Sequence, residues 1–253
     1  MDAKLIEEDI CEEALRILKA ARERKLALKL LGGVAIRFRC PSAARVPSLQ
    51  RTYKDIDFAT SAEAGRKLAD LFRELGYITD SLVNNLNWGE RQIFYDPQHG
   101  RQVDIFVGKF SMCHKIPFGE CCLTEEEAAT ICPADLLLTK AQIVHLNEKD
   151  VRDMLVLLLD HAVEKNDRGI NIERITSLTN NDWGFYHTVE LNMEKTKRML
   201  ENYALTIEQS DLVAGRIEDL LAGLRQSPKT LAWKIRSRIG ERVQWYEVPD
   251  EVC

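Results

Sequence analysis

The apolar pattern of the chain changes near residue 133, and this change constrains the fold more than any other feature. Before it, short apolar runs that suit strands alternate with stretches of helical period. From Pro133 onward almost every segment has the helical period. The sequence therefore predicts an α+β fold, with an N-terminal domain over residues 1–132, built from a mixed sheet with flanking helices, and a C-terminal helical bundle over residues 133–253.

The elements of both domains can be placed along the chain. An amphipathic helix over residues 4–26 precedes a buried strand that ends in Gly32 and Gly33, and a second helix follows these glycines. Ser61 and Gly76 suit the N-cap and C-cap of a third helix. Further strands are expected at residues 53–58, 77–84, 91–96 and 101–108. The last two should form a hairpin. C-terminal helices are expected at residues 134–146, 148–165, 171–180, 184–203, 206–225 and 228–241.

Three aspartates are expected at one edge of the sheet. Alternate residues of a strand share a face, so Asp55 and Asp57 should point the same way, while Ile56 and Phe58 point into the core. Asp104 lies on a second strand of similar apolar character. Converging carboxylates repel one another unless a cation lies among them, and hard oxygen ligands suit Mg²⁺ shared with substrate phosphates. The pattern predicts a metal-dependent phosphoryl or nucleotidyl transfer site.

The glycine pair adds a phosphate-binding element. Because Gly32 and Gly33 lack side chains, the backbone can approach a triphosphate closely, and free amides of the following helix can bind its oxygens. Two metal ions could then hold the attacking and leaving oxygens in line. Asp55 and Asp57 would hold both ions, and Asp104 would hold the one nearer the acceptor and orient or deprotonate the attacking hydroxyl.

This order of strand, Gly-Gly, helix, Asp-x-Asp strand and a later aspartate strand resembles the nucleotidyltransferase superfamily typified by DNA polymerase beta. Within it, the chain looks most like the small bacterial nucleotidyltransferases of the AbiEii type, the toxin class of certain toxin–antitoxin pairs. Residues 133–158 are similar to the family's late motif of a lysine followed by a basic residue and aspartate on a helix. The resemblance implies a nucleotidyltransferase-like fold for the N-terminal domain. By the same resemblance, Lys140 would contact the triphosphate and Asp153 would lie near the site, with Arg152 beside it.

The residues themselves leave other interpretations open. Lys140 borders an apolar stripe, so a snorkelling surface lysine fits as well as a phosphate ligand. Without the family resemblance, a solvated helix face with local ion pairs is expected for Lys149, Asp150, Arg152 and Asp153. The chain also departs from the family pattern, because a long spacer, residues 34–54, separates the glycines from the first aspartates, and Gly33 stands where many relatives have serine. Residues 40–52 within the spacer are expected to form a loop.

The composition limits the compartment in which the protein is expected and the partners it is expected to bind. No apolar run is long enough to span a membrane, and the N-terminus is too charged for a secretory signal, so a cytoplasmic protein without membrane contact is expected. Seven cysteines without a CxxC pair predict reduced thiols, and Cys113, His114 and the cysteines after them match no zinc-finger spacing. The net charge of −5 gives no sign of bulk affinity for nucleic acid, and no DNA partner is expected.

The C-terminal segment is locally basic. Between residues 223 and 242 the bases are Arg225, Lys229, Lys234, Arg236, Arg238 and Arg242, against the acid Glu241. Aromatic residues lie in the same segment: Trp233, Trp245 and Tyr246. Such a mixture can hold single-stranded nucleic acid. However, Leu231, Ile235 and Ile239 lie four apart and would bury one face of a terminal helix, with the bases in water. We expect the packed helix, and RNA stays an option as acceptor.

These features predict a Mg²⁺-dependent nucleotidyltransferase that moves a nucleoside monophosphate from an NTP to a hydroxyl group. The leading acceptors are RNA, such as a tRNA end, and protein side chains, and the resemblance implies a toxin with an antitoxin partner. Two alternatives remain. One is a catalytically inactive nucleotide-binding or partner-binding protein of the same fold, and the other is an RNA-binding module that uses the C-terminal basic helix.

Overall fold

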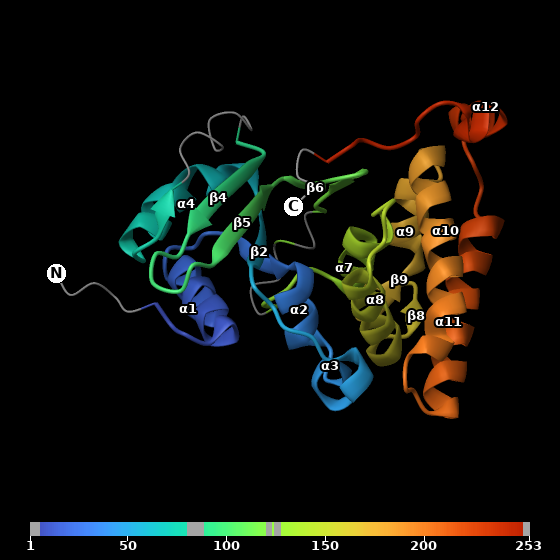
Figure 1. Cartoon of the computed structure of the whole chain (residues 1–253). Coiled ribbons are helices and arrows are strands. Elements are labelled where there is room, and N and C mark those ends of the chain that lie inside the picture. Colours follow the sequence, from blue (N-terminus) through green and yellow to red (C-terminus); the bar gives the residue numbers. More distant parts are fainter. Residues whose placement is uncertain (1–5, 80–88, 120–122, 124–127, 250–253) are drawn as a thin grey trace. The chain divides into compact units, whose positions relative to one another are not determined.

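The computed structural model describes residues 6–79, 89–119, 123 and 128–249. The chain forms two compact units, whose elements are drawn in Figure 1. The sheet unit comprises Met1–Arg39, Thr52–Phe110 and Pro117–Ile131. The helical unit comprises Cys40–Arg51, Ser111–Ile116 and Cys132–Cys253. Each unit has its own buried core.

The predicted fold class is confirmed, because the chain combines a mixed sheet, flanking helices and a C-terminal helical region. The last part of the sheet unit ends at Ile131, next to the predicted boundary. The two units alternate along the sequence, however, since residues 40–51 and 111–116 belong to the helical unit. The assignment of contiguous domains to residues 1–132 and 133–253 stays a prediction.

A five-stranded mixed sheet forms the centre of the sheet unit. In spatial order its strands are β1 (Leu28–Leu31), β2 (Ile56–Thr60), β5 (Gln102–Val107), β4 (Arg91–Tyr95) and β3 (Ile78–Thr79). Strand β2 is antiparallel to β1 and parallel to β5, and the antiparallel pair β4–β5 confirms the predicted hairpin. The register places Leu31 opposite Asp57, and Asp57 opposite Asp104. Most of the strand expected at residues 77–84 lies outside the described residues.

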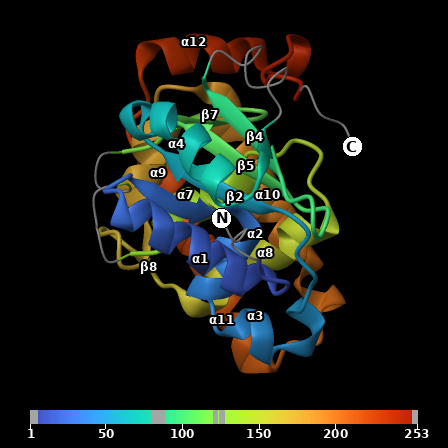
Figure 2. The same ribbon diagram turned by 90° about the vertical axis from the view of Figure 1, so that its left-hand side faces the viewer.

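Helix α4 (Ala62–Glu74) covers one face of this sheet, where the Phe72 ring stacks on Phe94 with centroids 4.3 Å apart. It begins where predicted, since the Ser61 hydroxyl accepts the amide of Ala64. Gly76 follows its end with a φ of 94°, a conformation that favours glycine. Figure 2 shows α4 and α1 in front of strands β2, β4 and β5.

The other two helices of the sheet unit flank β1 in the sequence. Helix α1 (Ile10–Glu23) begins later than the expected residue 4, because the Asp9 carboxylate caps it by accepting two backbone amides. Helix α2 (Gly32–Arg39) begins at the predicted glycines, directly after β1.

The helical unit contains the six predicted helices; five are shorter than expected, and α11 has the expected length, shifted by one residue. They are α7 (Pro133–Ala141), α8 (Glu148–Asp160), α9 (Ile172–Thr179), α10 (Trp183–Met199), α11 (Ile207–Gln226) and α12 (Leu231–Ile239), with 3-10 turns η2 (Leu200–Asn202) and η3 (Gly240–Arg242). Four short strands were not predicted: β6 (Lys109–Ser111), β7 (Lys115–Pro117), β8 (Val163–Glu164) and β9 (Ile170–Asn171). None of the helices in the described ranges is long and apolar enough to cross a bilayer.

Two expectations about these segments are wrong. Residues 40–52 are not a plain loop but contain α3 (Ser42–Arg45) and η1 (Pro47–Leu49), and Asp160 accepts hydrogen bonds from both the amide and the hydroxyl of Ser42. Helix α12 buries none of its residues, so its aliphatic stripe is not a packing face. In both cases the outcome depends on contacts that are distant in sequence, which a local pattern does not contain.

Candidate functional site

Asp57 and Asp104 lie opposite each other on the parallel strands β2 and β5. Residues in register on neighbouring strands share a face, so these two carboxylates, which we call the carboxylate pair, lie on the same face of the sheet. Asp104 is buried and Asp57 is half-buried. Asp55 lies one residue before β2 and is exposed, and it forms no ion pair with the part of the chain that the structure describes.

Gly32 packs directly against the Asp57 carboxylate. A Cβ atom on Gly32 would lie 2.1 Å from Asp57 Oδ2, and the φ of Gly32 is +68°. Both the close approach and the left-handed backbone therefore require glycine. Gly33 follows in the first turn of α2, so a helix N-terminus, which attracts anions, adjoins the carboxylate pair. The structure thus brings the predicted glycines and two of the predicted aspartates together.

Two further residues, which the sequence analysis missed, hold Asp104. The Arg91 Nε donates to Asp104 Oδ1 at 2.9 Å, and the Gln102 amide donates to Oδ2 at 2.8 Å. Gln102 lies two residues before Asp104 and so shares its face of β5. Arg91 reaches it from β4, where Ile93 lies opposite Asp104. These contacts fix the orientation of the Asp104 carboxylate.

The donor set of the carboxylate pair fits a divalent metal. Carboxylate oxygens are the ligands that Mg²⁺ prefers, and each carboxylate offers about four lone-pair directions, so Asp104 can accept a metal beside its two hydrogen bonds. Among the described residues, no group of three or more histidine, cysteine, aspartate or glutamate side chains is arranged to hold a metal ion. The joint site of Asp55, Asp57 and Asp104 therefore stays a prediction.

The helical unit contains a second charged group, which we call the ion-pair cluster: Arg51, Lys140, Asp150 and Asp153. Lys140 Nζ lies 3.2 Å from Asp150 Oδ1 and 3.1 Å from Asp153 Oδ2. Arg51 donates Nε and Nη2 to the two oxygens of Asp153, both at 2.7 Å. No side chain of the four is more than 15% exposed. Two positive and two negative charges therefore balance in a nearly dry environment.

This environment determines the protonation state of Lys140. Burial lowers the pKa of its ammonium group, but the carboxylates of Asp153 and Asp150 outweigh burial, and the pKa is raised overall. The expectation of a solvated face at residues 149–153 is wrong for Asp150 and Asp153, which are buried because they point to Lys140 and Arg51. The roles of Lys140 and Asp153 in nucleotide binding stay predictions, and a triphosphate would compete with two carboxylates for the ammonium group.

Arg51 also explains the long spacer between the glycines and the aspartates. Residues 40–51 of this spacer belong to the helical unit, where Ser42 binds Asp160 and Arg51 binds Asp153 at the two ends of the segment. The inserted residues therefore have a structural use. They lengthen the chain between α2 and β2 by a segment that packs on α8.

Several C-terminal side chains proposed for RNA contact are engaged within the helical unit. Trp245 Nε1 donates to Thr188 Oγ1 at 3.1 Å. Arg236 donates to the carbonyls of Gly240 and Val243, both at 2.7 Å. Arg225 pairs with Glu190 and Glu194, both at 2.8 Å. Lys229 donates to Asn180 and Ser227. Three of the six basic residues thus already have partners, and the RNA-binding alternative would depend on the others.

His114, considered above as a zinc ligand, is a buried neutral side chain. Its Nε2 lies 2.9 Å from Thr188 Oγ1, and its ring stacks on Phe185 with centroids 5.0 Å apart. Burial lowers the pKa of His114 to about 4. Cys113 and Cys132 are buried free thiols, while Cys121 and Cys122 lie outside the described residues.

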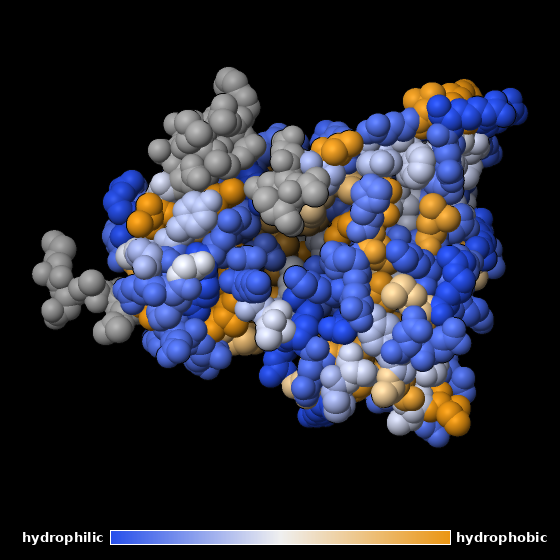
Figure 3. All heavy atoms as spheres, viewed as in Figure 1, coloured by the Kyte–Doolittle hydropathy of each residue, from blue (hydrophilic) through white to orange (hydrophobic). Residues whose placement is uncertain are grey.

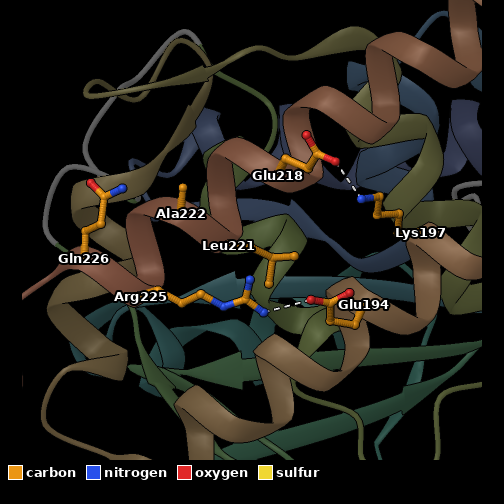
Figure 4. A pocket seen from close by; sticks show the side chains of 7 residues that line it. All are labelled: Glu194, Lys197, Glu218, Leu221, Ala222, Arg225 and Gln226. Carbon is orange, nitrogen blue, oxygen red and sulfur yellow. Dashed lines mark hydrogen bonds and ion pairs between the residues drawn. The ribbon is translucent and has the colours of Figure 1, made fainter.

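A groove of about 460 Å³ lies on the helical unit and is lined from α10 and α11 (Figure 4). Its charged side chains pair with one another. Lys197 lies 2.6 Å from Glu218, and Arg225 lies 2.8 Å from Glu194. A charged ligand in this groove would therefore have to compete with these ion pairs.

Comparisons with known proteins give a distant structural likeness. No family model matches the sequence, and no curated protein matches it. Among solved structures, the chain is similar to that of the antibiotic-resistance factor ANT(2'')-Ia, a solution structure described as revealing substrate-regulated conformation dynamics. The two share 15% identity, the match covers 85% of this chain and 94% of that chain, and the TM-score is 0.41. A likeness at this level carries no argument about function.

Proposed function

We propose that this protein is a metal-dependent nucleotidyltransferase that moves a nucleoside monophosphate from an NTP to a hydroxyl acceptor. The observation that supports the proposal most directly is the juxtaposition of Gly32, Asp57 and Asp104 at the start of α2. A glycine at which any side chain would collide with Asp57 lies against a carboxylate pair of the type that holds Mg²⁺. Both belong to the motif order on which the resemblance to nucleotidyltransferases depends.

Each residue has a role in this proposal. Asp57 and Asp104 would hold Mg²⁺, with Asp55 as a further ligand, and the bound metal would neutralise charge on the phosphates. The backbone of Gly32 and Gly33 would bind phosphate oxygens. Asp104, oriented by its hydrogen bonds, would direct the acceptor hydroxyl and take its proton. The acceptor oxygen then bonds to the α-phosphorus while the bond to pyrophosphate breaks.

The finer parts of the proposal rest on the sequence alone: on its composition, its basic C-terminal segment and the motif resemblance. They are an RNA or protein acceptor, a cytoplasmic location, a role as an AbiEii-like toxin with an antitoxin partner, and phosphate contacts from Lys140 and Asp153. The ion pairs of Lys140 make its contact the weakest of these parts.

The proposal is tested by incubating the protein with labelled NTPs, Mg²⁺ and either cell RNA or cell protein. We expect wild type to transfer label to one acceptor class, and both EDTA and Asp57→Ala to abolish transfer. Asp70→Ala is the matched control, because Asp70 lies on the exposed face of α4 and pairs only with its neighbour Arg73 among the described residues. Equal labelling by wild type and Asp57→Ala would refute the catalytic role.

The contact between Arg91 and Asp104 favours a second candidate, a protein that binds nucleotide without turnover. A guanidinium group that already offsets the Asp104 charge reduces the need for a metal there. Equilibrium binding of an NTP separates the candidates when it is measured beside the transfer assay. Tight NTP binding with no transfer to RNA or protein would favour the binding protein.

A further inference from the structure

Helix α12 reverses the usual arrangement of an amphipathic helix. Its aliphatic residues Leu231, Ile235 and Ile239 are 74%, 55% and 41% exposed. The opposite side faces the bundle, where Trp233 meets the Tyr186 ring edge-on and Arg236 lies over the Trp183 ring. Figure 3 shows the resulting apolar patch at the top right, over α12. A helix in water normally hides such a stripe, so an exposed one marks an interaction site.

A row of basic residues runs beside the aliphatic stripe. Lys234 and Arg238 lie four apart on α12, Arg242 follows in the 3-10 turn η3, and all three are exposed. None of them pairs with an acid in the described ranges, whereas Arg225 on α11 pairs with two. The stripe therefore has an uncompensated positive edge.

We propose that this surface, Leu231, Ile235 and Ile239 with the row Lys234, Arg238 and Arg242, docks an acidic amphipathic helix of a partner protein. The stripe presents one aliphatic residue per turn, which is the width that a single facing helix covers. The basic row along one edge complements glutamates or aspartates at the edge of that helix. This inference does not depend on the proposed catalytic function.

Other occupants fit the pattern less well. An antiparallel pair of two copies would bring both basic rows to the same side, where they repel. A helix that lies in a membrane surface carries a wide apolar face with aromatic residues at the interface, whereas Trp233 of α12 faces the bundle. RNA has no complement for an aliphatic stripe, and the aromatic rings that could stack on bases contact one another inside the unit.

The test uses a labelled synthetic helix of about 21 residues, with leucine at the a and d positions and glutamate at e and g of its heptads. A second peptide carries lysine at e and g. Binding to the full-length protein is measured by fluorescence anisotropy. We expect the glutamate helix to bind about tenfold more tightly than the lysine helix, and Lys234→Glu with Arg238→Glu to reverse this preference.

Ile235→Ser should weaken binding of the glutamate helix about tenfold, because the contact area of one isoleucine is lost. Ile207→Ser is the matched control, since Ile207 on α11 is 78% exposed but lies outside the stripe, and it should leave binding unchanged. Both sites are exposed, so folding should be unaffected, which circular dichroism checks.

Three outcomes would overturn the proposal. Equal affinity for the two peptides, or affinity for neither, would exclude an acidic helix. A dimer in sedimentation that Ile235→Ser converts to monomer would assign the stripe to a second copy. Binding to phosphatidylglycerol vesicles that Ile235→Ser abolishes would assign it to lipid.

Discussion

The carboxylate pair and the ion-pair cluster both combine aspartates with arginine, yet they differ in what completes them. In the cluster, Lys140 and Arg51 match two buried aspartates, and no external group is needed. In the carboxylate pair, Arg91 contacts Asp104, while the Asp57 carboxylate lies against the bare backbone of Gly32. A closed charge balance serves stability, whereas carboxylates beside an open glycine backbone suit a metal and a phosphate.

The largest expected effect comes from Asp57→Asn, which keeps the size of the side chain and removes its charge. Transfer activity should fall about 10³-fold or more, because a neutral amide is a poor Mg²⁺ ligand. The free energy of unfolding should change far less than the activity, since a like charge beside Asp104 is removed. Single-turnover kinetics and urea unfolding measure the two quantities. If Asp57→Asn lost stability but kept full activity, the carboxylate pair would serve stability rather than catalysis.

Asp153→Asn should give the opposite profile. It leaves Arg51 and Lys140 in the interior with the single carboxylate of Asp150, and the free energy of unfolding should fall by about 3 kcal/mol. The KM for NTP should change little. If KM instead rises about tenfold in a stably folded variant, the cluster contacts nucleotide, as the family resemblance implies.

Gly32→Ala should affect both stability and activity. A Cβ atom would collide with the Asp57 carboxylate, and the left-handed backbone is strained for alanine, so we expect a loss of about 2 kcal/mol in stability. Activity should fall with it, because Asp57 has to move. Gly240→Ala has a similar φ of +61° and open space around it, so it controls for backbone strain alone.

His114→Gln should alter the acid sensitivity of the helical unit. The folded pKa of about 4 lies below the ordinary value, so stability is fully present above about pH 6.5 and is lost as the pH falls towards 4. For wild type this group alone accounts for about 2 kcal/mol between pH 7 and pH 5. Unfolding at both pH values should give a smaller difference for the glutamine variant. An unchanged difference would mean that the His114 ring is not the group responsible.

The smallest effect is expected for the exposed ion pair of the groove in Figure 4, Lys197 with Glu218. Lys197→Gln should cost less than about 1 kcal/mol, and salt should reduce the effect further. A loss as large as that of Asp153→Asn would show that burial is not what separates the ion-pair cluster from surface pairs.

The fold could be predicted where the cause is local. Ser61 marks the start of α4 because a hydroxyl before an apolar period caps a helix, and the hairpin follows from alternation on both sides of a turn. The structure of residues 40–52 and the orientation of the α12 faces could not be predicted. They depend on Asp160 and on the aromatic side chains of α10, which are distant in sequence.

The same division holds for the candidate site. Strand alternation and the order of the motifs were enough to expect Gly32, Asp57 and Asp104 together. The contact of Arg91 with Asp104 could also have been predicted, since the register of the hairpin places both side chains on the same face of the sheet. The pairing of Arg51 with Asp153 had no such signal, because Arg51 lies outside any helix or strand and 102 positions before Asp153 on α8.

The most direct test of the central claim is anomalous diffraction from crystals soaked with Mn²⁺ and a non-hydrolysable NTP analogue. We expect a Mn²⁺ peak about 2 Å from carboxylate oxygens of both Asp57 and Asp104, with the phosphates of the analogue at the backbone of Gly32 and Gly33. A carboxylate pair without metal, while nucleotide or Mn²⁺ binds at the ion-pair cluster instead, would contradict the assignment of chemistry to one group and stability to the other.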